Sequence, residues 1–431
     1  MTSVRPDTAA ALLREVAAVQ SASRLPSLVA GVVRDGELVW SAARGRFADR
    51  GGALPGPDTQ YRIGSITKTL TAILVMQCRD DGLLALSDPI GKHLPGIGYG
   101  HLTVRNLLAH SGGMNAEPVG DWWERNPGVS FEQLAAALDE SIAAGVPDRR
   151  FHYSNLGFGL LGELVTRLRD KPWMELAQAR VLDPLGMRRT TYLPQAPAAQ
   201  GFSIHPWTHR LDDEPAYDSG AMAPAGQLWS TLEDLARYAS FWIDPVSEVL
   251  APATVDEMAA PMANDPNEGL TASYGLGLRL HADDPHVLTG HTGSMPGFLA
   301  GLFVDRGRRI GAVTLANATS GKAPSLALEL VRKVGALEPP LPPEWVPEPE
   351  LPVGEELLGP WHWGNTPYLM TIEGGILVLA NPDGSRVTRF RVIGKDLYEG
   401  LDGYFAGERL QAHSTHLNLA TFILTRTPYA G

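Results

Sequence analysis

The chain has 431 residues, of which 44% are hydrophobic and 19% are charged, and its formal net charge is −12. The length exceeds that of one small domain, and the composition is typical of a globular protein and excludes a disordered one. The negative charge argues against a nucleic-acid partner. The single cysteine excludes a disulfide framework and a cysteine-rich zinc site.

Residues 8–20 have the pattern of an amphipathic helix. The first twenty residues lack the continuous apolar stretch of a signal peptide. No segment reaches the roughly 18 apolar residues that a membrane span needs. We therefore expect a cytoplasmic protein with no membrane contact.

The next segments predict a mixed domain. Residues 28–33 and 37–41 predict two strands, joined by Asp35-Gly36, a pair typical of tight hairpins. Helical patterns follow at 65–80, 103–110, 131–144, 155–170, 174–186 and 231–243, and strand patterns return at 276–280, 298–305 and 309–317. Strands at both ends with helices between them predict an α+β fold, in which an antiparallel sheet joins distant segments and packs with a helical subdomain.

The last quarter of the chain has a different texture. Seven prolines lie between residues 339 and 352, which predicts an extended linker. Short β-rich runs follow at 368–372, 376–379, 387–392, 410–412 and 417–424, and glycine-containing turns separate several of them. We therefore expect a catalytic domain at 1–337, a linker at 338–352 and a small all-β, barrel-like domain at 353–431.

The first candidate catalytic motif is Gly64-Ser65-Ile66-Thr67-Lys68, at the start of a predicted helix. A serine there is either a helix cap or a nucleophile. Lys68 lies one turn further on the same face, where partial desolvation lowers the pKa of an ammonium. Such a lysine can take the hydroxyl proton of Ser65, and the helix N-terminus favours a nearby oxyanion.

Two further motifs extend the site. In Tyr153-Ser154-Asn155, the phenol can carry a proton between nucleophile and leaving group, and the amide can orient the lysine or a substrate carbonyl. The segment Gly290–Ser294 precedes a predicted strand, and an edge strand there can pair with an extended substrate. The N–H group of Ser294 can complete an oxyanion hole with that of Ser65.

The order Ser-x-x-Lys, Tyr-x-Asn and His-Thr-Gly resembles the serine hydrolases related to class C β-lactamases and D,D-carboxypeptidases, over roughly residues 10–335. The resemblance implies an acyl-enzyme on Ser65 and further catalytic roles for Lys68, Tyr153 and His291. It implies substrate or oxyanion contacts by Asn155, Thr292, Gly293 and Ser294. No metal and no cofactor is expected, and either Lys68 or Tyr153 can be the base.

The sequence departs from many β-lactamases at His291, where they carry lysine. A neutral imidazole holds a β-lactam carboxylate less firmly than an ammonium does, which favours ester, thioester or peptide acyl transfer. His110 belongs to a His-Ser-Gly-Gly run, which predicts that His110 has a structural role in a turn. The aromatic clusters Trp122-Trp123 and Trp361-His362-Trp363 are either core or walls of an acyl pocket.

A β-lactamase-like domain followed by a small lipocalin-like domain resembles the stand-alone thioesterases of the penicillin-binding-protein type. These enzymes release nonribosomal peptides from a carrier protein, often by head-to-tail cyclisation. The resemblance implies a peptidyl thioester or ester substrate ending in a D-residue, and a tail domain that excludes water from the site. Arg426 is the candidate substrate contact of the tail, and a structural role is the other interpretation.

Two alternatives stay open. A cytosolic serine esterase or D-aminopeptidase-like hydrolase would use the same residues with water as acceptor. A catalytically silent binding or sensor protein would keep the fold without the chemistry. The presence of the whole residue set, from Ser65 to His291, disfavours the second alternative.

Overall fold

The computed structural model describes residues 3–47, 53–265, 268–342, 344–347 and 355–429. The chain divides into two compact units, residues 1–340 and 341–431, and the division falls within the proline-rich segment. The described part of that segment, 339–342 and 344–347, forms neither helix nor strand. The rest of the predicted linker, at 343 and 348–352, lies outside the described residues.

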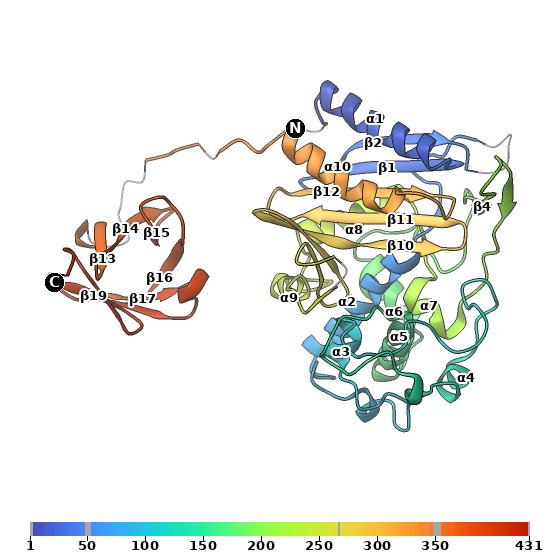
Figure 1. The fold of residues 1–431 in the computed structure, drawn as a ribbon, viewed down its shortest axis with the longest axis horizontal. Coiled ribbons are helices and arrows are strands. Elements are labelled where there is room, and N and C mark those ends of the chain that lie inside the picture. Colours follow the sequence, from blue (N-terminus) through green and yellow to red (C-terminus); the bar gives the residue numbers. More distant parts are fainter. Residues whose placement is uncertain (1–2, 48–52, 266–267, 343, 348–354, 430–431) are drawn as a thin grey trace. The chain divides into compact units, whose positions relative to one another are not determined.

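The first unit is built on one antiparallel sheet of eight strands, in the order β2-β1-β12-β11-β10-β9-β8-β7 (Figure 1). Its strands are β1 Ser27–Arg34, β2 Glu37–Gly45, β7 Ala263–Asn264, β8 Ala272–Tyr274, β9 Arg279–Asp283, β10 His286–Met295, β11 Phe298–Asp305 and β12 Ile310–Ala316. β1 pairs with β12, with Leu28 opposite Ala316. The predicted joining of distant segments is therefore confirmed, although β1 and β12 lie inside the sheet rather than at its edge.

The hairpin between β1 and β2 has the predicted turn. Asp35 and Gly36 adopt φ angles of 50° and 85°, both in the left-handed region. Two such positions match the twist of the flanking strands, and only short polar residues and glycine adopt them readily.

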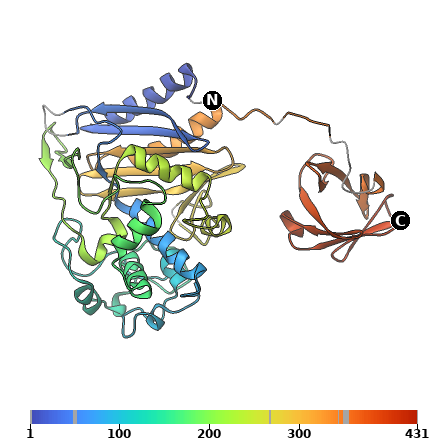
Figure 2. The same cartoon turned by 180° about the vertical axis from the view of Figure 1, so that it is seen from behind.

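Helices cover both faces of the sheet (Figure 1 and Figure 2). α1 Pro6–Ala22 and α10 Ala323–Leu337 pack on one face, and α8 Leu232–Ile243 packs on the other. Alternate residues of β1 point to the two faces of the sheet. Leu28 and Val32 pack in the core under α1 and α10, whereas Val29 and Val33 pack in the core on the α8 side. Burial on both faces explains why β1 is a continuous apolar run rather than an alternating one.

A helical subdomain lies between β2 and β7 in sequence. Its helices are α2 Thr67–Asp80, α3 Val104–Leu108, α4 Phe131–Ala136, α5 Asn155–Arg169, α6 Trp173–Ala177, the π-helix Gln178–Leu182, α7 Ala223–Gly226 and α9 Pro252–Met258. Short 3-10 turns occur at Ile90–Lys92, Glu140–Ile142 and Gly220–Met222, and two small sheets pair β3 Tyr61–Arg62 with β6 Trp229–Ser230 and β4 Phe202–Ile204 with β5 Leu211–Asp213.

Two predicted helices are shorter than their patterns. The segment predicted as one helix at 131–144 is α4 followed by a separate turn, because the Asp139 side chain accepts from the Ser141 N–H and starts a new 3-10 turn. In the 103–110 segment, Thr103 is the N-cap of α3, and His110 leaves the helix with a φ of 54°. The structure adds α9 and α10, for which the sequence pattern predicts no element.

The second unit is a closed antiparallel barrel of eight strands, which confirms the predicted all-β, barrel-like fold. Its strands are β13 Gly359–Trp363, β14 Thr366–Glu373, β15 Ile376–Ala380, β16 Thr388–Gly394, β17 Leu397–Gly400, β18 Arg409–Ala412, β19 His416–Leu419 and β20 Phe422–Thr425. The run predicted as one strand at 417–424 is two strands, which turn at Ala420 with a φ of 52°. Within the described residues, no helix has the length and apolar character needed to cross a membrane.

Candidate active site

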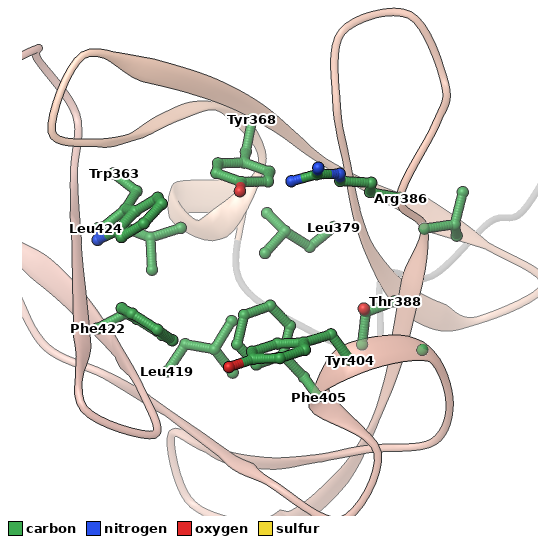
Figure 3. Close-up of a pocket in the computed structure, with 12 residues that line it drawn as sticks. Trp363, Tyr368, Leu379, Arg386, Thr388, Tyr404, Phe405, Leu419, Phe422 and Leu424 are labelled. Carbon is green, nitrogen blue, oxygen red and sulfur yellow. The ribbon is translucent and has the colours of Figure 1, made fainter.

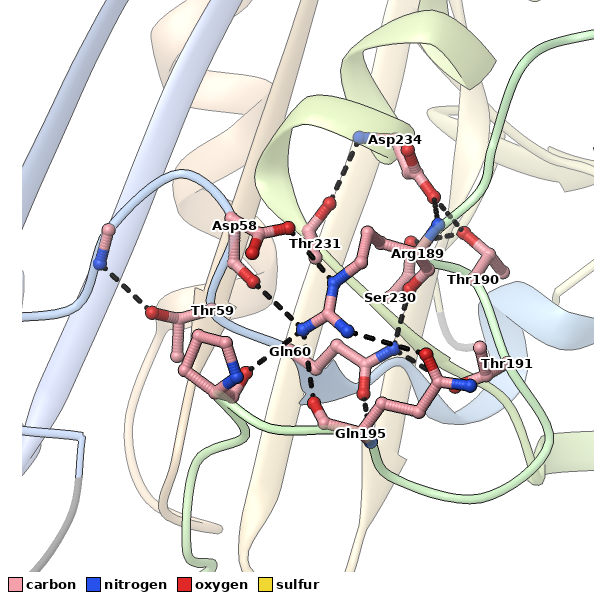
Figure 4. Close-up of polar contacts among 12 residues, drawn as sticks. Asp58, Thr59, Gln60, Arg189, Thr190, Thr191, Gln195, Ser230, Thr231 and Asp234 are labelled. Carbon is pink, nitrogen blue, oxygen red and sulfur yellow. Dashed lines mark hydrogen bonds and ion pairs between the residues drawn. The ribbon is translucent and has the colours of Figure 1, made fainter.

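β3 leads to the site, and a part-buried polar network around Gln60 holds the residue that precedes this strand (Figure 4). The Gln60 side chain donates to the Arg189 carbonyl at 2.7 Å and to Thr191 Oγ1 at 2.9 Å, and it accepts from the Gln195 N–H at 2.6 Å. Gln60 is fully buried. The network fixes the backbone a few residues before Ser65.

Gln60→Ala should lower the free energy of unfolding by about 1–3 kcal/mol, because it leaves the Arg189 carbonyl and the Gln195 N–H, both in part-buried hydrogen bonds, without these partners. Urea denaturation measures this change. Gln178→Ala is the control, since it removes only an exposed bond to Asp183, and it should cost under about 0.5 kcal/mol. Equal losses in the two variants would contradict a structural role of the network.

Ser65 lies in a 3-10 turn, Gly64–Ile66, that runs directly into α2. Gly64 has a φ of 50°, and a Cβ atom there would lie 2.5 Å from the backbone nitrogen of Ser294. Gly293 approaches from the opposite strand, where a Cβ would lie 1.9 Å from the Ile63 carbonyl oxygen. The two glycines thus let β10 lie directly against the turn that carries Ser65.

Lys68 is completely buried and points at Ser65. Its Nζ lies 2.9 Å from Ser65 Oγ and donates to the Ala225 carbonyl of α7 at 2.7 Å. Burial lowers the pKa of Lys68 to about 7, and the nearby carboxylates of Glu117 and Glu124 oppose this shift. The neutral amine is therefore accessible near neutral pH, as a base for the Ser65 hydroxyl requires.

Tyr153 precedes α5 and lies beside this pair. Lys68 Nζ is 5.1 Å from the centroid of the Tyr153 ring. Burial raises the pKa of Tyr153, and its hydrogen bond with Ser65 works against that rise. The phenol is therefore protonated near neutral pH, and it can donate a proton to a leaving group at Ser65.

Two buried rings support Tyr153 from behind. The His110 ring lies 4.3 Å from the Tyr153 ring, centroid to centroid, and His110 Nδ1 accepts from the Ser154 N–H at 3.0 Å. Tyr274 packs against His110 at 4.6 Å. Burial lowers the pKa of His110 well below its ordinary value, so this imidazole is neutral. His110 therefore has the structural role that its turn motif predicts.

Asn155 begins α5, and its amide donates to Glu117 Oε1 at 2.6 Å. The other oxygen of Glu117 accepts from the Trp123 indole N–H at 2.7 Å. Asn155 and Trp123 thus orient a carboxylate whose charge favours the protonated form of Lys68. No sequence motif marks Glu117, so sequence reasoning did not find it.

Strand β10 presents alternate residues to opposite faces. Thr292 is half-buried and Ser294 is exposed, whereas His291 and Gly293, which alternate with them, are buried. β9 pairs with residues 286–290 of β10 only, while β11 pairs with 288–295. The strand is therefore internal in its first half. Among the described residues, no strand pairs with its second half on the β9 side, where an extended substrate can add.

The structure does not place His291 where it could act as a catalytic group, the role that the resemblance implies. This side chain is 1% exposed, because it projects to the face of β10 opposite Thr292. Its Nδ1 donates to the Thr292 carbonyl at 2.5 Å, so its Nε2 accepts from the Tyr274 hydroxyl at 2.8 Å. Burial and the charge of Arg279 lower the pKa of His291 well below its ordinary value. His291 is a neutral support behind Tyr153.

The structure also corrects the interpretation of Arg426 as a substrate contact. Arg426 follows β20, and its guanidinium donates to the carbonyls of Leu358 at 2.8 Å and Pro360 at 3.0 Å, and also to that of Glu356. It stacks on the Trp361 ring at 3.9 Å. These contacts close the barrel, so Arg426 has the structural role that was the alternative interpretation.

Together, Ser65, Lys68 and Tyr153 form the arrangement of an active-site serine enzyme, with a nucleophile, a base and a proton donor in contact. The family model described as Beta-lactamase matches residues 10–336, and the chain therefore belongs to the β-lactamase family of serine hydrolases. A second model, a domain of unknown function (DUF7586), matches residues 351–426.

Known proteins of similar sequence or fold include β-lactamase-like and penicillin-binding proteins. Beta-lactamase-like protein 2 of Dictyostelium discoideum is 28% identical over 67% of this chain, and the match spans only 55% of that protein. The octameric penicillin-binding protein homologue of Pyrococcus abyssi has a TM-score of 0.69 at 24% identity, over 96% of this chain and 99% of its own. SurE has a TM-score of 0.63 at 24% identity, over 98% and 99%, and a second structure of SurE contains D-Leu.

Proposed function

We propose that this protein is a thioesterase of the penicillin-binding-protein type that releases a nonribosomal peptide from its carrier by head-to-tail cyclisation. The observation that carries the proposal is the contact between Ser65 and Lys68. A fully buried lysine with a pKa near 7 is within hydrogen-bond distance of the serine hydroxyl. This pair can form an ester with an acyl donor near neutral pH.

Domain architecture supports the specific activity. The fold of SurE, a thioesterase of this type, matches 98% of this chain and 99% of its own, so the match includes both units of this chain. The choice of a donor that ends in a D-residue follows the SurE structure with D-Leu. A cytoplasmic location and a carrier-bound substrate are parts of the same proposal.

The proposed reaction has two steps. Ser65 Oγ attacks the thioester carbonyl, its proton passes to Lys68, and the carrier thiol leaves with a proton while a peptidyl ester forms. The amino terminus of the same peptide then attacks this ester and loses a proton, and Ser65 regains one as it leaves. An amide ring and free serine result. Water in place of the amine would give the linear acid.

A matched pair of peptidyl thioesters tests the proposal. The two donors differ only in whether the last residue is D-Leu or L-Leu, and product mass separates the ring from the linear acid, which is one water heavier. We expect at least about a tenfold higher kcat/KM for the D-ended donor, and mainly the ring as product. Equal rates with only linear acid would overturn the proposal and favour the esterase alternative.

A further inference from the structure

The barrel contains a cavity that the acyl-transfer chemistry does not use. Its volume is about 480 Å³, within the range of small-molecule sites. Figure 3 shows its lining side chains arranged around an open centre. Five aromatic residues and one arginine dominate the wall: Trp363, Tyr368, Tyr404, Phe405, Phe422 and Arg386.

The cavity exists because the interior of the barrel is filled at one end only. Trp361 and Trp363 project to the same face of β13. Trp361 is 3% exposed and belongs to the barrel core, whereas Trp363 is 47% exposed and lines the cavity. Leu419 and Leu424, both buried, link the core to the cavity wall. One aromatic of the tryptophan cluster is therefore core and the other is the wall of a pocket.

The aromatic wall favours an apolar occupant. The rings of Trp363 and Phe422 meet edge to face at 5.1 Å, and Phe405 meets Phe422 at 6.0 Å. Tyr404 is 83% exposed. Exposed aromatic surface in a concave wall gains free energy when an apolar group covers it.

Arg386 gives the cavity one positive charge. In the described part of the chain, its guanidinium has no hydrogen-bond or ion-pair partner, whereas Arg389 pairs with Asp402 and Arg391 with Glu399. Among the described residues that line the cavity, none has an acidic side chain. A guanidinium with free donors at an apolar cavity matches a carboxylate, which it can bind with two parallel hydrogen bonds.

We propose that the barrel binds an amphipathic carboxylic acid, with an aryl or acyl body against the aromatic wall and its carboxylate on Arg386. This binding site uses residues of the barrel alone. The proposal therefore does not depend on the thioesterase function, and each can fail without the other.

Titration of the full-length protein with a dansyl-labelled undecanoic acid, followed by dansyl fluorescence, tests this site. The methyl ester of the same probe supplies the body without the charge. We expect saturable binding of both probes, with the acid bound more tightly. Arg386→Gln should weaken binding of the acid by about tenfold and leave the ester unchanged. Tyr404→Ala should weaken both by about threefold to tenfold.

Arg409→Gln is the matched control, because Arg409 is an exposed arginine of the same barrel outside the cavity wall. It should bind both probes like the native protein. The proposal is overturned if the native protein binds neither probe, or binds acid and ester alike. It is also overturned if Arg386→Gln and Arg409→Gln have equal effects.

Discussion

Replacing Ser65 by alanine should reduce the turnover of an activated ester or a peptidyl thioester by at least about a thousandfold. The loss is large because Ser65 Oγ is the atom that is acylated in the proposed reaction, and the base Lys68 Nζ lies 2.9 Å from it. Steady-state rates give the loss. The intact mass of a trapped species should show one acyl group on the native protein and none on the variant.

Ser294→Ala is the matched control, since it removes a serine hydroxyl from the same site. Ser294 is predicted to act through its backbone N–H, which alanine retains. The control should therefore lose less than about tenfold in rate. Equal turnover by the native protein and Ser65→Ala would contradict the assignment of Ser65 as the nucleophile.

The rate of acylation should rise with pH and level off above about 7. Lys68 has a pKa of about 7 because burial disfavours its charged form. Only the neutral amine can take the Ser65 proton, so the active fraction grows as pH rises through that pKa. A pH profile of kcat/KM for a simple ester, whose own ionisation does not change in this range, measures the effect.

Glu117→Gln tests whether the titration of Lys68, rather than that of another group, causes this pH dependence. The carboxylate of Glu117 raises the pKa of Lys68, so its removal should move the rising limb to lower pH. Glu163→Gln removes a half-buried carboxylate that pairs with Arg167, and it should leave the rising part of the pH profile in place. Two outcomes would argue against Lys68 as the base. The rising part of the pH profile could stay unchanged in Glu117→Gln, or it could disappear only in Tyr153→Phe.

Much of the fold could be predicted because its signals are local. The Asp35-Gly36 turn needs two left-handed residues, and the sequence supplies residues that adopt that conformation. Short β-rich runs with turns between them predicted a barrel. Element ends were predicted less well. The helix pattern at 131–144 contains a second cap at Asp139, and only the folded backbone shows that this cap starts a separate turn.

The candidate site also contains residues that the sequence could predict and residues that it could not. The spacing of Ser65 and Lys68 places them on one helical face, so their contact could be predicted from sequence. His291 and Thr292 are adjacent in sequence and face opposite sides of β10, so at most one of them could line the groove. Glu117 belongs to no motif, and it is recognisable only because Asn155 and Trp123 hold its carboxylate close enough to act on Lys68.

The amino-acid sequence by itself determined the class of protein: a serine enzyme with a β-lactamase-like domain and a small β-barrel. It could do so because the nucleophile motif, the turn residues and the strand periods are short-range patterns. The tertiary structure decided which of the candidate residues serve the site and which serve the fold. Arg426 and Arg386 look alike in sequence, yet Arg426 is bound to three carbonyls, whereas Arg386 lies at the cavity and has no partner among the residues that the structure describes. Partners and burial, which depend on the whole fold, make that difference.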